Sequence, residues 1–600
     1  MTPTSMAAGT ATATLRLAGR ELISGSAQGE LLFSDVGLSF WGGVDAASGE
    51  VIDRHHPLRG ESLAGRVLAI PRGRGSCTGS SVLLELILNG HAPAALVFAE
   101  ADEILTLGVM VAEALFERSL PVLCLDDERF ERLRGAAWLR LEDACATRFA
   151  QPPTDGWTPR PAPPWEIATV DGAIGLCDDD RAVLEGLHGK AAQAAMRIVL
   201  RMAGLQGASE LVEVSQAHID GCIYTGPASL EFAQRLLDWG ARVRVPTTLN
   251  AISVDQRRWR SQGVDPAFAE PASRLGDVYL AMGAQPSFTC APYLLDTAPK
   301  RGEQIAWAES NAVVYANSVL GARSQKYPDF LDICIALVGR APNAGGHLDE
   351  GRLARLRIDF APPSDFDDAL YPLLGYQVGL LSGADIPVIQ GLAALAPGSD
   401  ELKAFGAAFA TTSAAPMFHI VGVTPEAADL STALGGIAPE RTLRIGVAEL
   451  VEGWHALNLT AQTRVTLVAL GNPHFSLSEC VRLAELCAGR RKHPQVAMIV
   501  TCSRATLQHA ERAGHVAMLE AFGAQFVTDT CWCMIQAPLI SPPDGTLITN
   551  SAKYAHYAPG LVDRQIRFAS LSACVEAACS GEASALAPAW LVDADHLGGE

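Results

Sequence analysis

Short apolar runs, separated by turn-forming residues, fill the first 150 residues of the chain. Five runs have the length of strands, at 31–33, 38–40, 67–70, 94–98 and 121–125, and residues 82–89 have the composition of a helix. Strands that alternate with short helices are typical of a compact α/β unit. The pattern therefore predicts a small, strand-rich α/β domain over residues 1–150.

A proline-rich segment follows this domain. Six of the fourteen residues from 151 to 164 are proline. Such a run forms neither a helix nor a central strand, and it behaves as a semi-rigid spacer. We therefore expect residues 151–165 to link the small domain to a larger domain over residues 166–590.

The larger domain has a helical pattern in its first part. Strong helix formers and an apolar stripe predict a helix over 181–203. A second helix is predicted over 227–240, with Gly240 at its end.

Near the end of the chain, apolar strands alternate with helices. The strands are predicted at 465–470, 496–500 and 526–527, and each runs into a polar segment. A β-α-β-α-β order predicts a parallel sheet, and ligands bind outside the carboxyl ends of such strands. The polar segments should therefore line one crevice.

The composition of the chain mainly argues against certain classes of protein, such as nucleic-acid binders and membrane proteins. The 600 residues suffice for about four domains of average size, and 49% of them are hydrophobic, so the chain can bury large cores. The net charge of 46 − 66 = −20 argues against a general binder of nucleic acid or anionic membranes. No apolar run reaches the ~18 residues of a membrane span. Residues 1–15 lack the features of a secretion signal, so we expect a cytoplasmic protein whose fourteen cysteines are mostly reduced, buried thiols.

A glycine-rich loop at 72–81 is the first candidate for chemistry. It stands between a predicted strand and a predicted helix and contains Ser76. Glycines let the backbone approach a ligand, and amides at a helix start favour an anion. The loop matches neither a Walker A loop nor a dinucleotide-binding fingerprint, and a glycine-rich turn with a serine N-cap explains it equally well.

Cysteines and polar residues of the larger domain are the other candidates. Cys290 lies in a turn-rich stretch and Cys531 at a strand end, where a thiolate is a better ligand than in a core. Widely separated cysteines can hold an iron–sulfur cluster. Asn250, Glu309 and Lys553 stand in polar segments that suit a pocket lining. Each of these residues also has an ordinary structural explanation that is at least as good when the residue is taken alone. The cysteines would be buried thiols, Asn250 a turn residue, Glu309 a residue on a helix surface and Lys553 a solvated lysine.

Taken together, motifs along nearly the whole chain resemble aconitase X, a divergent branch of the aconitase superfamily. In the small domain they are Ser39-Phe40-Trp41-Gly42-Gly43-Val44-Asp45, Leu58-Arg59-Gly60 and Pro71-Arg72-Gly73-Arg74-Gly75-Ser76. In the larger domain they include Tyr224-Thr225-Gly226, Thr289-Cys290, Gly346-His347, Asn472-Pro473-His474 and Ser551-Ala552-Lys553. The family has a two-chain form, associated with mevalonate 5-phosphate dehydration, and a fused form, associated with cis-3-hydroxy-L-proline dehydration. This chain resembles the fused form.

The resemblance implies a fold and a set of site residues. The implied fold is a small swivelling β/α domain, joined by the proline-rich linker to a large aconitase-like α/β catalytic domain with parallel sheets. Ser76 would be the base, with Glu309 and Lys553 as further catalytic residues, and Cys290 and Cys531 would be ligands of an iron–sulfur cluster. The residues implied to line the substrate site are Gly221, Cys222, Ile223, Asn250, Ala251, Ser310 and Lys553.

One position departs from the family pattern. The two-chain form has a third cysteine directly before Pro-His, where this chain has Asn472. The third ligand is then expected to be Cys502, with Cys533 or the region of Asn472 as alternatives, because these strand ends should share the crevice. The same departure favours a [2Fe-2S] cluster over a four-iron cluster.

The implied reaction is removal of water from cis-3-hydroxy-L-proline to give Δ1-pyrroline-2-carboxylate, a step of hydroxyproline catabolism. Cluster iron would act as a Lewis acid on the hydroxyl group. Because a serine hydroxyl is a weak base, the loop amides and a cation such as Arg74 or Lys553 would have to stabilise its alkoxide.

Two alternatives remain open from the sequence. One is a dehydratase of another small β-hydroxy acid such as mevalonate 5-phosphate, and the other is a non-catalytic iron-sensing protein. In the main reading we expect a small-molecule substrate, no nucleic-acid or membrane partner, and a monomer with fused domains.

Overall fold

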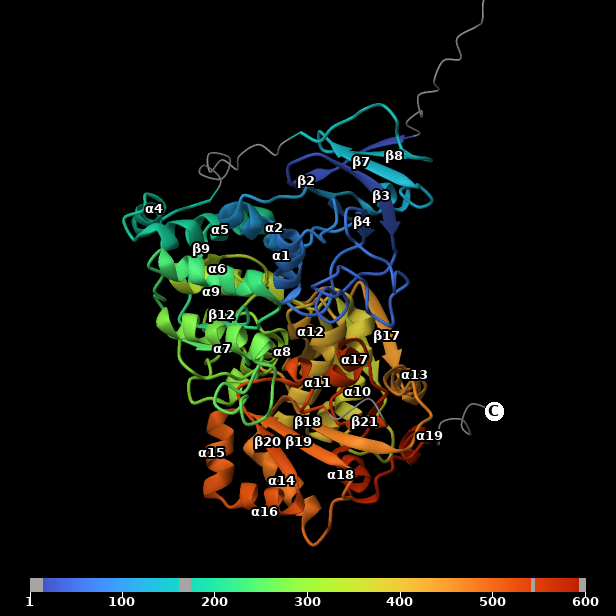
Figure 1. Cartoon of the computed structure of the whole chain (residues 1–600). Coiled ribbons are helices and arrows are strands. Elements are labelled where there is room, and N and C mark those ends of the chain that lie inside the picture. The colour runs from blue at the N-terminus through green and yellow to red at the C-terminus, as the bar shows by residue number, and fades with distance from the viewer. Residues whose placement is uncertain (1–14, 161–173, 541–544, 593–600) are drawn as a thin grey trace, which may run out of the picture. The chain divides into compact units, whose positions relative to one another are not determined.

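The computed structural model describes residues 15–160, 174–540 and 545–592 (Figure 1). The chain forms two compact units. The first unit comprises residues 1–74 and 79–172, and the second comprises residues 75–78 and 173–600. The four residues 75–78 of the glycine-rich loop therefore pack as part of the second unit.

An eight-stranded sheet forms the core of the first unit, in the order β1-β8-β7-β3-β4-β5-β6-β2. Its central strands run parallel and confirm the predicted alternation: β3 (Ala27–Phe33), β4 (Val67–Ile70), β5 (Ala95–Phe98) and β6 (Val122–Cys124). The outer strands are antiparallel to their neighbours: β1 (Leu15–Ala18), β2 (Arg20–Ile23), β7 (Trp138–Glu142) and β8 (Cys145–Phe149). The helices of this unit are α1 (Gly79–Asn89), α2 (Glu103–Phe116) and α3 (Asp127–Glu131).

Two predictions for the first unit need adjustment. The helix predicted over 82–89 begins earlier, at Gly79. The apolar run at 38–40 is not a strand, because Leu38 makes only an isolated bridge to Gly73 and Phe40 packs into the interior.

The described part of the proline-rich segment lies against the first unit. Arg140 forms an ion pair with Asp155 at 2.7 Å and stacks over the ring of Trp157. The backbone N–H of Arg160 donates to Ser26 Oγ over 2.6 Å. Residues 161–165 of the predicted linker and residues 1–14 of the N-terminus lie outside the described residues.

Parallel sheets run through the second unit. A three-stranded sheet consists of β11 (Thr247–Leu249), β10 (Ala217–Ile219) and β12 (Ala306–Trp307), and a four-stranded sheet consists of β16 (His419–Ile420), β15 (Pro387–Gln390), β14 (Leu356–Phe360) and β17 (Arg441–Ile445). A five-stranded sheet consists of β20 (Ala524–Val527), β19 (Ala497–Cys502), β18 (Val465–Phe475), β21 (Thr546–Thr549) and β22 (Ile566–Phe568). One antiparallel pair joins β9 (Leu211–Glu213) to β13 (Arg340–Pro342).

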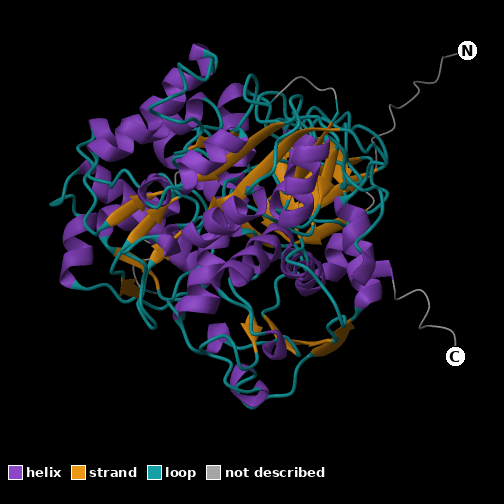
Figure 2. Ribbon diagram, turned by 90° about the horizontal axis from the view of Figure 1, so that it is seen from below, coloured by secondary structure: helices purple, strands orange, loops and turns teal. Residues whose placement is uncertain are grey.

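Helices alternate with these strands (Figure 2). In the first half of the second unit they are α4 (Asp178–Leu184), α5 (Lys190–Gln206), α6 (Pro227–Asp238), α7 (Pro266–Ala281), α8 (Ser310–Tyr315), α9 (Leu331–Val338) and α10 (Leu370–Ser382). In the second half they are α11 (Ser399–Thr412), α12 (Leu430–Ala433), α13 (Val447–Leu457), α14 (Leu477–Cys487), α15 (Arg504–Arg512), α16 (His515–Phe522), α17 (Ala552–Leu561), α18 (Leu571–Ser580) and α19 (Ala589–Val592).

The helix predicted over 181–203 is two helices. The chain leaves α4 after Leu184 and starts α5 at Lys190, and Gly186 and Gly189 between them both have positive φ. Leu187, which the apolar stripe placed inside, is 75% exposed at this turn. A left-handed backbone is cheap only for glycine, so the two glycines break the helix.

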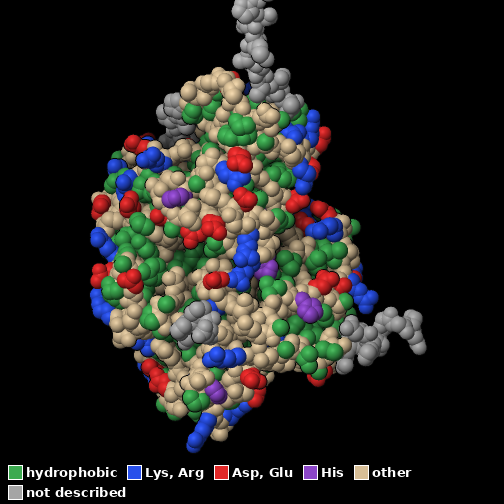
Figure 3. All heavy atoms as spheres, turned by 45° about the vertical axis from the view of Figure 1, so that its right-hand side comes forward, with side chains coloured by type: hydrophobic (Ala, Val, Ile, Leu, Met, Phe, Trp, Pro, Cys, Tyr) green, Lys and Arg blue, Asp and Glu red, His purple; other side chains and the backbone are tan. Residues whose placement is uncertain are grey.

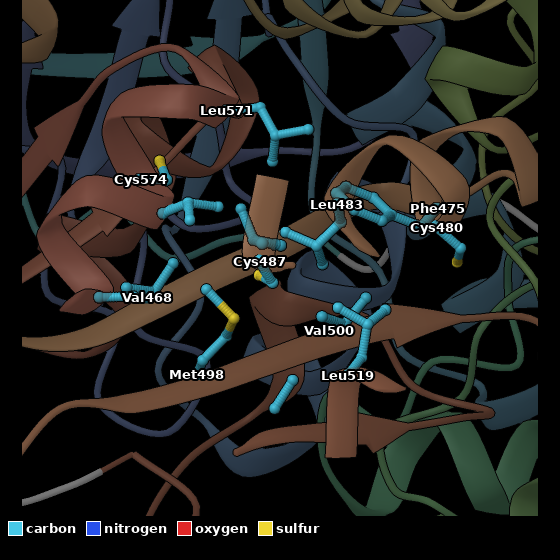
Figure 4. Packing of buried hydrophobic residues seen from close by; sticks show 14 of the residues in the cluster. Val468, Phe475, Cys480, Leu483, Cys487, Met498, Val500, Leu519, Leu571 and Cys574 are labelled. Atoms are coloured by element: carbon cyan, nitrogen blue, oxygen red, sulfur yellow. The ribbon is translucent and has the colours of Figure 1, made fainter. Parts of the chain in front are cut away.

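The five-stranded sheet confirms the parallel layout predicted near the end of the chain. β18 pairs in parallel with β19, and β19 in parallel with β20. β18 continues through the predicted polar segment 471–474 to Phe475, with a register shift after Leu470. Apolar side chains of the strands and of α14, α16 and α18 interlock beneath the sheet (Figure 4).

Among the described residues, no helix is both long and apolar enough to cross a membrane. On the face drawn in Figure 3, acidic and basic side chains are interspersed.

Candidate active site

Three neighbouring strands of the second unit end in polar residues. Asp220 follows β10, Asn250 follows β11, and Glu309 lies just past β12. Because β10 pairs in parallel with both other strands, their carboxyl ends meet at one edge. The Asn250 amide donates hydrogen bonds to Asp220 and, over 3.1 Å, to Glu309 Oε2. All three side chains are buried.

A buried ion pair extends this group. Lys553 Nζ, from α17, lies 2.8 Å from Glu309 Oε1, and Asn311 donates to the same oxygen. Burial acts to raise the pKa of Glu309. The charge and hydrogen bond of Lys553, together with the hydrogen bonds from the side chain and backbone of Asn311, outweigh burial and lower the pKa to about 2. Burial opposes charge on Lys553 as well, yet Glu309 and nearby cysteines hold its pKa well above the usual value. Both groups are therefore charged.

Further carboxyl groups surround Asp220. Burial, and then the carboxyls of Asp329, Glu309 and Asp332, raise the pKa of Asp220 well above its usual value. Asp332 Oδ2 accepts the backbone N–H groups of Asp220 at 2.7 Å and Gly221 at 3.2 Å. Burial raises the pKa of Asp332 to about 6 although these N–H groups oppose the rise. The site is thus rich in buried acid.

Ser76 reaches the same group through a second hydroxyl. Ser76 Oγ lies 3.1 Å from Thr78 Oγ1, and Thr78 Oγ1 donates to Asp220 Oδ2 over 3.3 Å. The backbone N–H of Thr78 donates to Ser76 Oγ over 3.3 Å. A continuous chain of hydrogen bonds therefore joins the three residues predicted as catalytic, Ser76, Glu309 and Lys553. The chain runs through three further residues, in the order Ser76, Thr78, Asp220, Asn250, Glu309 and Lys553.

Arg74, one of the two cations considered for the serine alkoxide, has a carboxylate partner. Its guanidinium forms an ion pair with Asp53 of the first unit at 2.8 Å. The Asp53 side chain is 7% exposed, so the pair is largely withdrawn from water. The Arg74 charge is therefore balanced within the first unit.

The predicted substrate-lining residues flank these carboxyl and amide groups. Gly221, Cys222 and Ile223 directly follow Asp220, Ala251 follows Asn250, and Ser310 follows Glu309 at the start of α8. The Cys222 thiol donates to the backbone oxygens of Ile219 and Asn250, each over 3.4 Å, and burial raises its pKa. Cys222 therefore ties β10 to β11 through a neutral thiol.

Three cysteines form a second cluster, close to the Lys553 ammonium. Cys531 and Cys533 share a hydrogen bond, which raises the pKa of Cys531 and lowers that of Cys533. Cys531 is also among the groups that raise the pKa of the Cys290 thiol, after burial itself. Backbone N–H groups point at two of the sulfurs, from His474 to Cys290 over 3.3 Å and from Cys533 to Cys531 over 3.4 Å.

His474 holds the cysteine segments together. Its Nε2 lies 2.8 Å from the backbone oxygen of Thr530, and its Nδ1 lies 3.1 Å from the hydroxyl of Thr289. Since a carbonyl only accepts, Nε2 carries the hydrogen and Nδ1 accepts from Thr289. Burial lowers the pKa of His474 to about 4, so the ring is neutral at pH 7. Thr289 directly precedes Cys290 and Thr530 directly precedes Cys531.

Cys502, predicted as the third ligand, is not brought to this cluster. It lies in the hydrophobic core beneath the five-stranded sheet, with Phe475 and Cys480. Burial raises the pKa of its thiol well above the usual value, and Cys480 raises it further. The end of β19 lies in the core instead of the crevice. The third thiol of the cysteine group is therefore Cys533, which the sequence analysis gave as an alternative to Cys502.

The three thiols fit an iron–sulfur cluster. N–H donors to the sulfurs are typical surroundings of such ligands. Asn472, in the place of the family's third cysteine, donates to Cys533 Sγ over 3.4 Å, and its buried Oδ1 has no hydrogen-bond partner among the described residues. Within the described ranges, no three histidine, cysteine or carboxylate side chains are spaced for a single metal ion. The ligands of a cluster are divided among several iron atoms, so this spacing does not conflict with one.

Comparison with known proteins identifies the family. The chain matches the aconitase X swivel domain over residues 16–147, and the first, second and third aconitase X domains over 173–350, 354–455 and 465–580. The chain belongs to the aconitase X family. The family resemblance inferred from the sequence motifs is thereby confirmed, and so is the fold class.

Relatives of this aconitase X chain fall into two groups. It is 62% identical to cis-3-hydroxy-L-proline dehydratase of Pseudomonas aeruginosa, over 95% of this chain and 98% of that protein. It is 54% identical to the protein of the same name from Hypocrea jecorina, over 94% and 95% of the two chains. The phosphomevalonate dehydratase large subunit of Methanothermobacter thermautotrophicus is 35% identical, over 65% of this chain and 95% of that subunit.

A solved structure supports the same assignment. The crystal structure of Thermococcus kodakaraensis aconitase X, in its holo-form, superposes with a TM-score of 0.60 at 29% identity. The match covers 68% of this aconitase X chain and the whole of that chain.

Sequence reasoning missed two residues of the site, Thr78 and Asp220. Each stands next to a residue that was predicted: Thr78 is two positions after Ser76, and Asp220 directly precedes Gly221. No hydrophobic pattern marked Asp220, because the preceding strand β10 has only three residues and one of them is His218.

Proposed function

We propose that this chain is a hydro-lyase that removes water from cis-3-hydroxy-L-proline and forms Δ1-pyrroline-2-carboxylate, a step of hydroxyproline catabolism. The observation that carries the proposal is the 62% identity to a cis-3-hydroxy-L-proline dehydratase over 98% of that protein's length. The hydrogen-bonded chain from Ser76 to Lys553 supplies groups suited to the reaction.

The stereochemistry of the substrate sets the arrangement of the groups. The hydroxyl and the carboxylate lie on one face of a cis-3-hydroxyproline ring, and the α-hydrogen lies on the opposite face. The two bonds therefore break on opposite faces, and the base must approach from the face without the hydroxyl. In this proposal Ser76 is that base, and Glu309 and Lys553 orient the substrate from the edge of the three-stranded sheet.

The proposed cofactor is a [2Fe-2S] cluster held by Cys290, Cys531 and Cys533, with Asn472 beside it. When bound, such a group supplies a Lewis acid for the poor hydroxide leaving group. His474 fixes the backbone directly before Cys290 and directly before Cys531, through Thr289 and Thr530. Lys553 adds a positive charge near the thiols, which favours their thiolate forms.

The charge of the site favours an amino acid over a phosphate ester. Asp220, Asp329, Asp332 and Glu309 are buried and lie close enough to interact, while the nearby Lys553 ammonium is already paired with Glu309. An ionised carboxylate attracts the ring ammonium of a proline and repels a phosphate dianion, and a buried carboxyl that its raised pKa keeps neutral still offers no positive charge to a phosphate. Mevalonate 5-phosphate, the substrate class of the more distant relatives, is therefore the weaker candidate.

A substrate panel tests the proposal. Protein purified without oxygen is incubated with the cis and trans isomers of 3- and 4-hydroxyproline and with mevalonate 5-phosphate, and loss of water is followed by mass spectrometry. We expect Δ1-pyrroline-2-carboxylate from cis-3-hydroxy-L-proline alone. Turnover of mevalonate 5-phosphate, or of none of these compounds by protein that carries iron, would falsify the proposal.

A further inference from the structure

The proposed base raises a chemical difficulty. A serine hydroxyl is far too weak to take an α-hydrogen unless its own proton leaves at the same time or its alkoxide is strongly stabilised. Arg74, the nearest cation in sequence, is paired with Asp53. Lys553 is paired with Glu309 and is five hydrogen bonds away from Ser76 along the polar chain. A route for the serine proton answers the difficulty better than a cation does.

The atoms behind Ser76 provide such a route. The Ser76 and Thr78 hydroxyl oxygens lie 3.1 Å apart, and Thr78 Oγ1 lies 3.3 Å from Asp220 Oδ2. These distances exceed the ~2.5–3.0 Å that is usual between the oxygens of a hydroxyl hydrogen bond, and catalytic hydrogen bonds are often long before substrate tightens a site. Ser76 is 8% exposed, Thr78 is 1% exposed and Asp220 is fully buried, so bulk water does not offer a competing path along this line.

We propose that Thr78 and Asp220 form a proton relay that makes Ser76 a base. The inference rests on the proposed dehydration and adds two residues to it. Thr78 and Asp220 act through Ser76 and are positioning residues, while Ser76 alone meets the substrate.

The relay balances in protons and electrons. The α-carbon–hydrogen bond breaks, and its electron pair forms the double bond to C3 as the C3–oxygen bond releases hydroxide. The resulting enamine then loses its N–H proton and gains a proton at C3, which gives Δ1-pyrroline-2-carboxylate. The α-hydrogen passes as a proton to Ser76 Oγ, while the Ser76 proton passes to Thr78 Oγ1 and the Thr78 proton passes to Asp220 Oδ2. When Asp220 later returns its proton to solvent, that proton and the hydroxide together make the released water.

The surroundings of Asp220 suit a terminal proton acceptor. Its Oδ1 accepts from the Asn250 amide, which has only hydrogens to offer, so Oδ2 is the atom left to take a proton. Burial, and then the carboxyls of Asp329, Glu309 and Asp332, oppose a negative charge on Asp220 and raise its pKa, so Asp220 holds a proton that reaches it and the relay runs from its ionised form. Asp332 Oδ2 holds the backbone of Asp220 in place by accepting a hydrogen bond from the Asp220 N–H group.

Thr78→Val and Thr78→Ser form a matched pair of tests. Valine keeps the shape of threonine and removes the hydroxyl, whereas serine keeps the hydroxyl. In iron-loaded protein, we expect Thr78→Val to lower kcat for cis-3-hydroxy-L-proline about 100-fold with KM changed less than about threefold. Thr78→Ser is expected to stay within about tenfold of the wild-type kcat. Asp220→Asn, which cannot take the proton at Oδ2 as a carboxylate does, should behave like Thr78→Val.

A deuterium isotope effect separates the relay from a structural role. With substrate deuterated at the α-carbon, Thr78→Val should show a larger isotope effect on kcat than the wild type, because removal of the α-hydrogen becomes more fully rate-limiting. Two results would overturn the relay: a Thr78→Val kcat within about threefold of wild type, or a lowered kcat with no increase in the isotope effect. If wild-type protein with its iron does not dehydrate the substrate, the proposed function itself fails, and the two failures remain distinct.

Discussion

At the scale of single residues, the cysteines fall into groups that differ in their surroundings. Cys290, Cys531 and Cys533 interact with one another close to a buried ammonium, whereas Cys502 lies among apolar side chains. Sequence position alone could not separate Cys502 from Cys533, because both stand near the ends of strands of one parallel sheet. The difference lies in which way each strand end turns, and that depends on packing.

Iron content tests this division. We expect Cys531→Ala to lose most of its iron and sulfide, because a cluster ligand is removed, whereas Cys502→Ala, the matched control, should keep the wild-type content of about two irons per chain. Iron and acid-labile sulfide are measured after oxygen-free purification. Equal retention in both variants would contradict the ligand assignment.

The Glu309–Lys553 pair offers a second test at this scale. Removing one partner of a buried ion pair leaves an unpaired charge, so Glu309→Gln should lower the free energy of unfolding by about 3 to 5 kcal/mol at neutral pH. The double variant Glu309→Gln with Lys553→Met should recover part of this loss, since no buried charge remains. Denaturant unfolding of the two single variants and the double variant gives the coupling energy. Additive losses would show that the two groups do not interact.

At the scale of elements, much of the layout follows from the sequence. The strand–helix alternation of the first unit and the parallel sheet of β18, β19 and β20 were predicted from apolar runs and intervening helices, and the structure confirms them. The short strands β10 and β12 escaped prediction, because runs of three and two residues carry no periodicity. The site edge that they form was therefore invisible as an element, although its residues Glu309 and Asn250 were expected from the family resemblance.

The end of β18 makes an element-scale prediction. His474 joins the segment before Cys290 to the segment before Cys531, so His474→Ala should release both and lower iron content. His347→Ala is the matched control, because His347 is also a buried neutral histidine but bonds Tyr327 and Gln304. Both variants should lose stability by thermal unfolding, and only His474→Ala should lose iron. Loss of iron from both to the same degree would contradict the role of His474.

At the scale of the whole molecule, composition indicated how the chain is built but not what it does. The apolar content predicted large cores, and the structure has separate cores under the sheets of the two units. The proline-rich run predicted a linker over residues 151–165, whereas the two compact units divide after residue 172, so the predicted boundary stays a prediction. The placement of residues 75–78 in the second unit could not be read from the sequence, because it depends on contacts with Asp220 and Asp329 that are distant along the chain.

The central claim is that this chain dehydrates cis-3-hydroxy-L-proline with Ser76 as the base. The most direct measurement follows the fate of deuterium at the α-carbon of that substrate, by NMR, with iron-loaded wild type and Ser76→Ala. The account predicts that the wild type forms Δ1-pyrroline-2-carboxylate and releases the deuterium to solvent, while Ser76→Ala does both at least about 100-fold more slowly. Deuterium release and product formation by Ser76→Ala at the wild-type rate, or no product from the wild type, would contradict it.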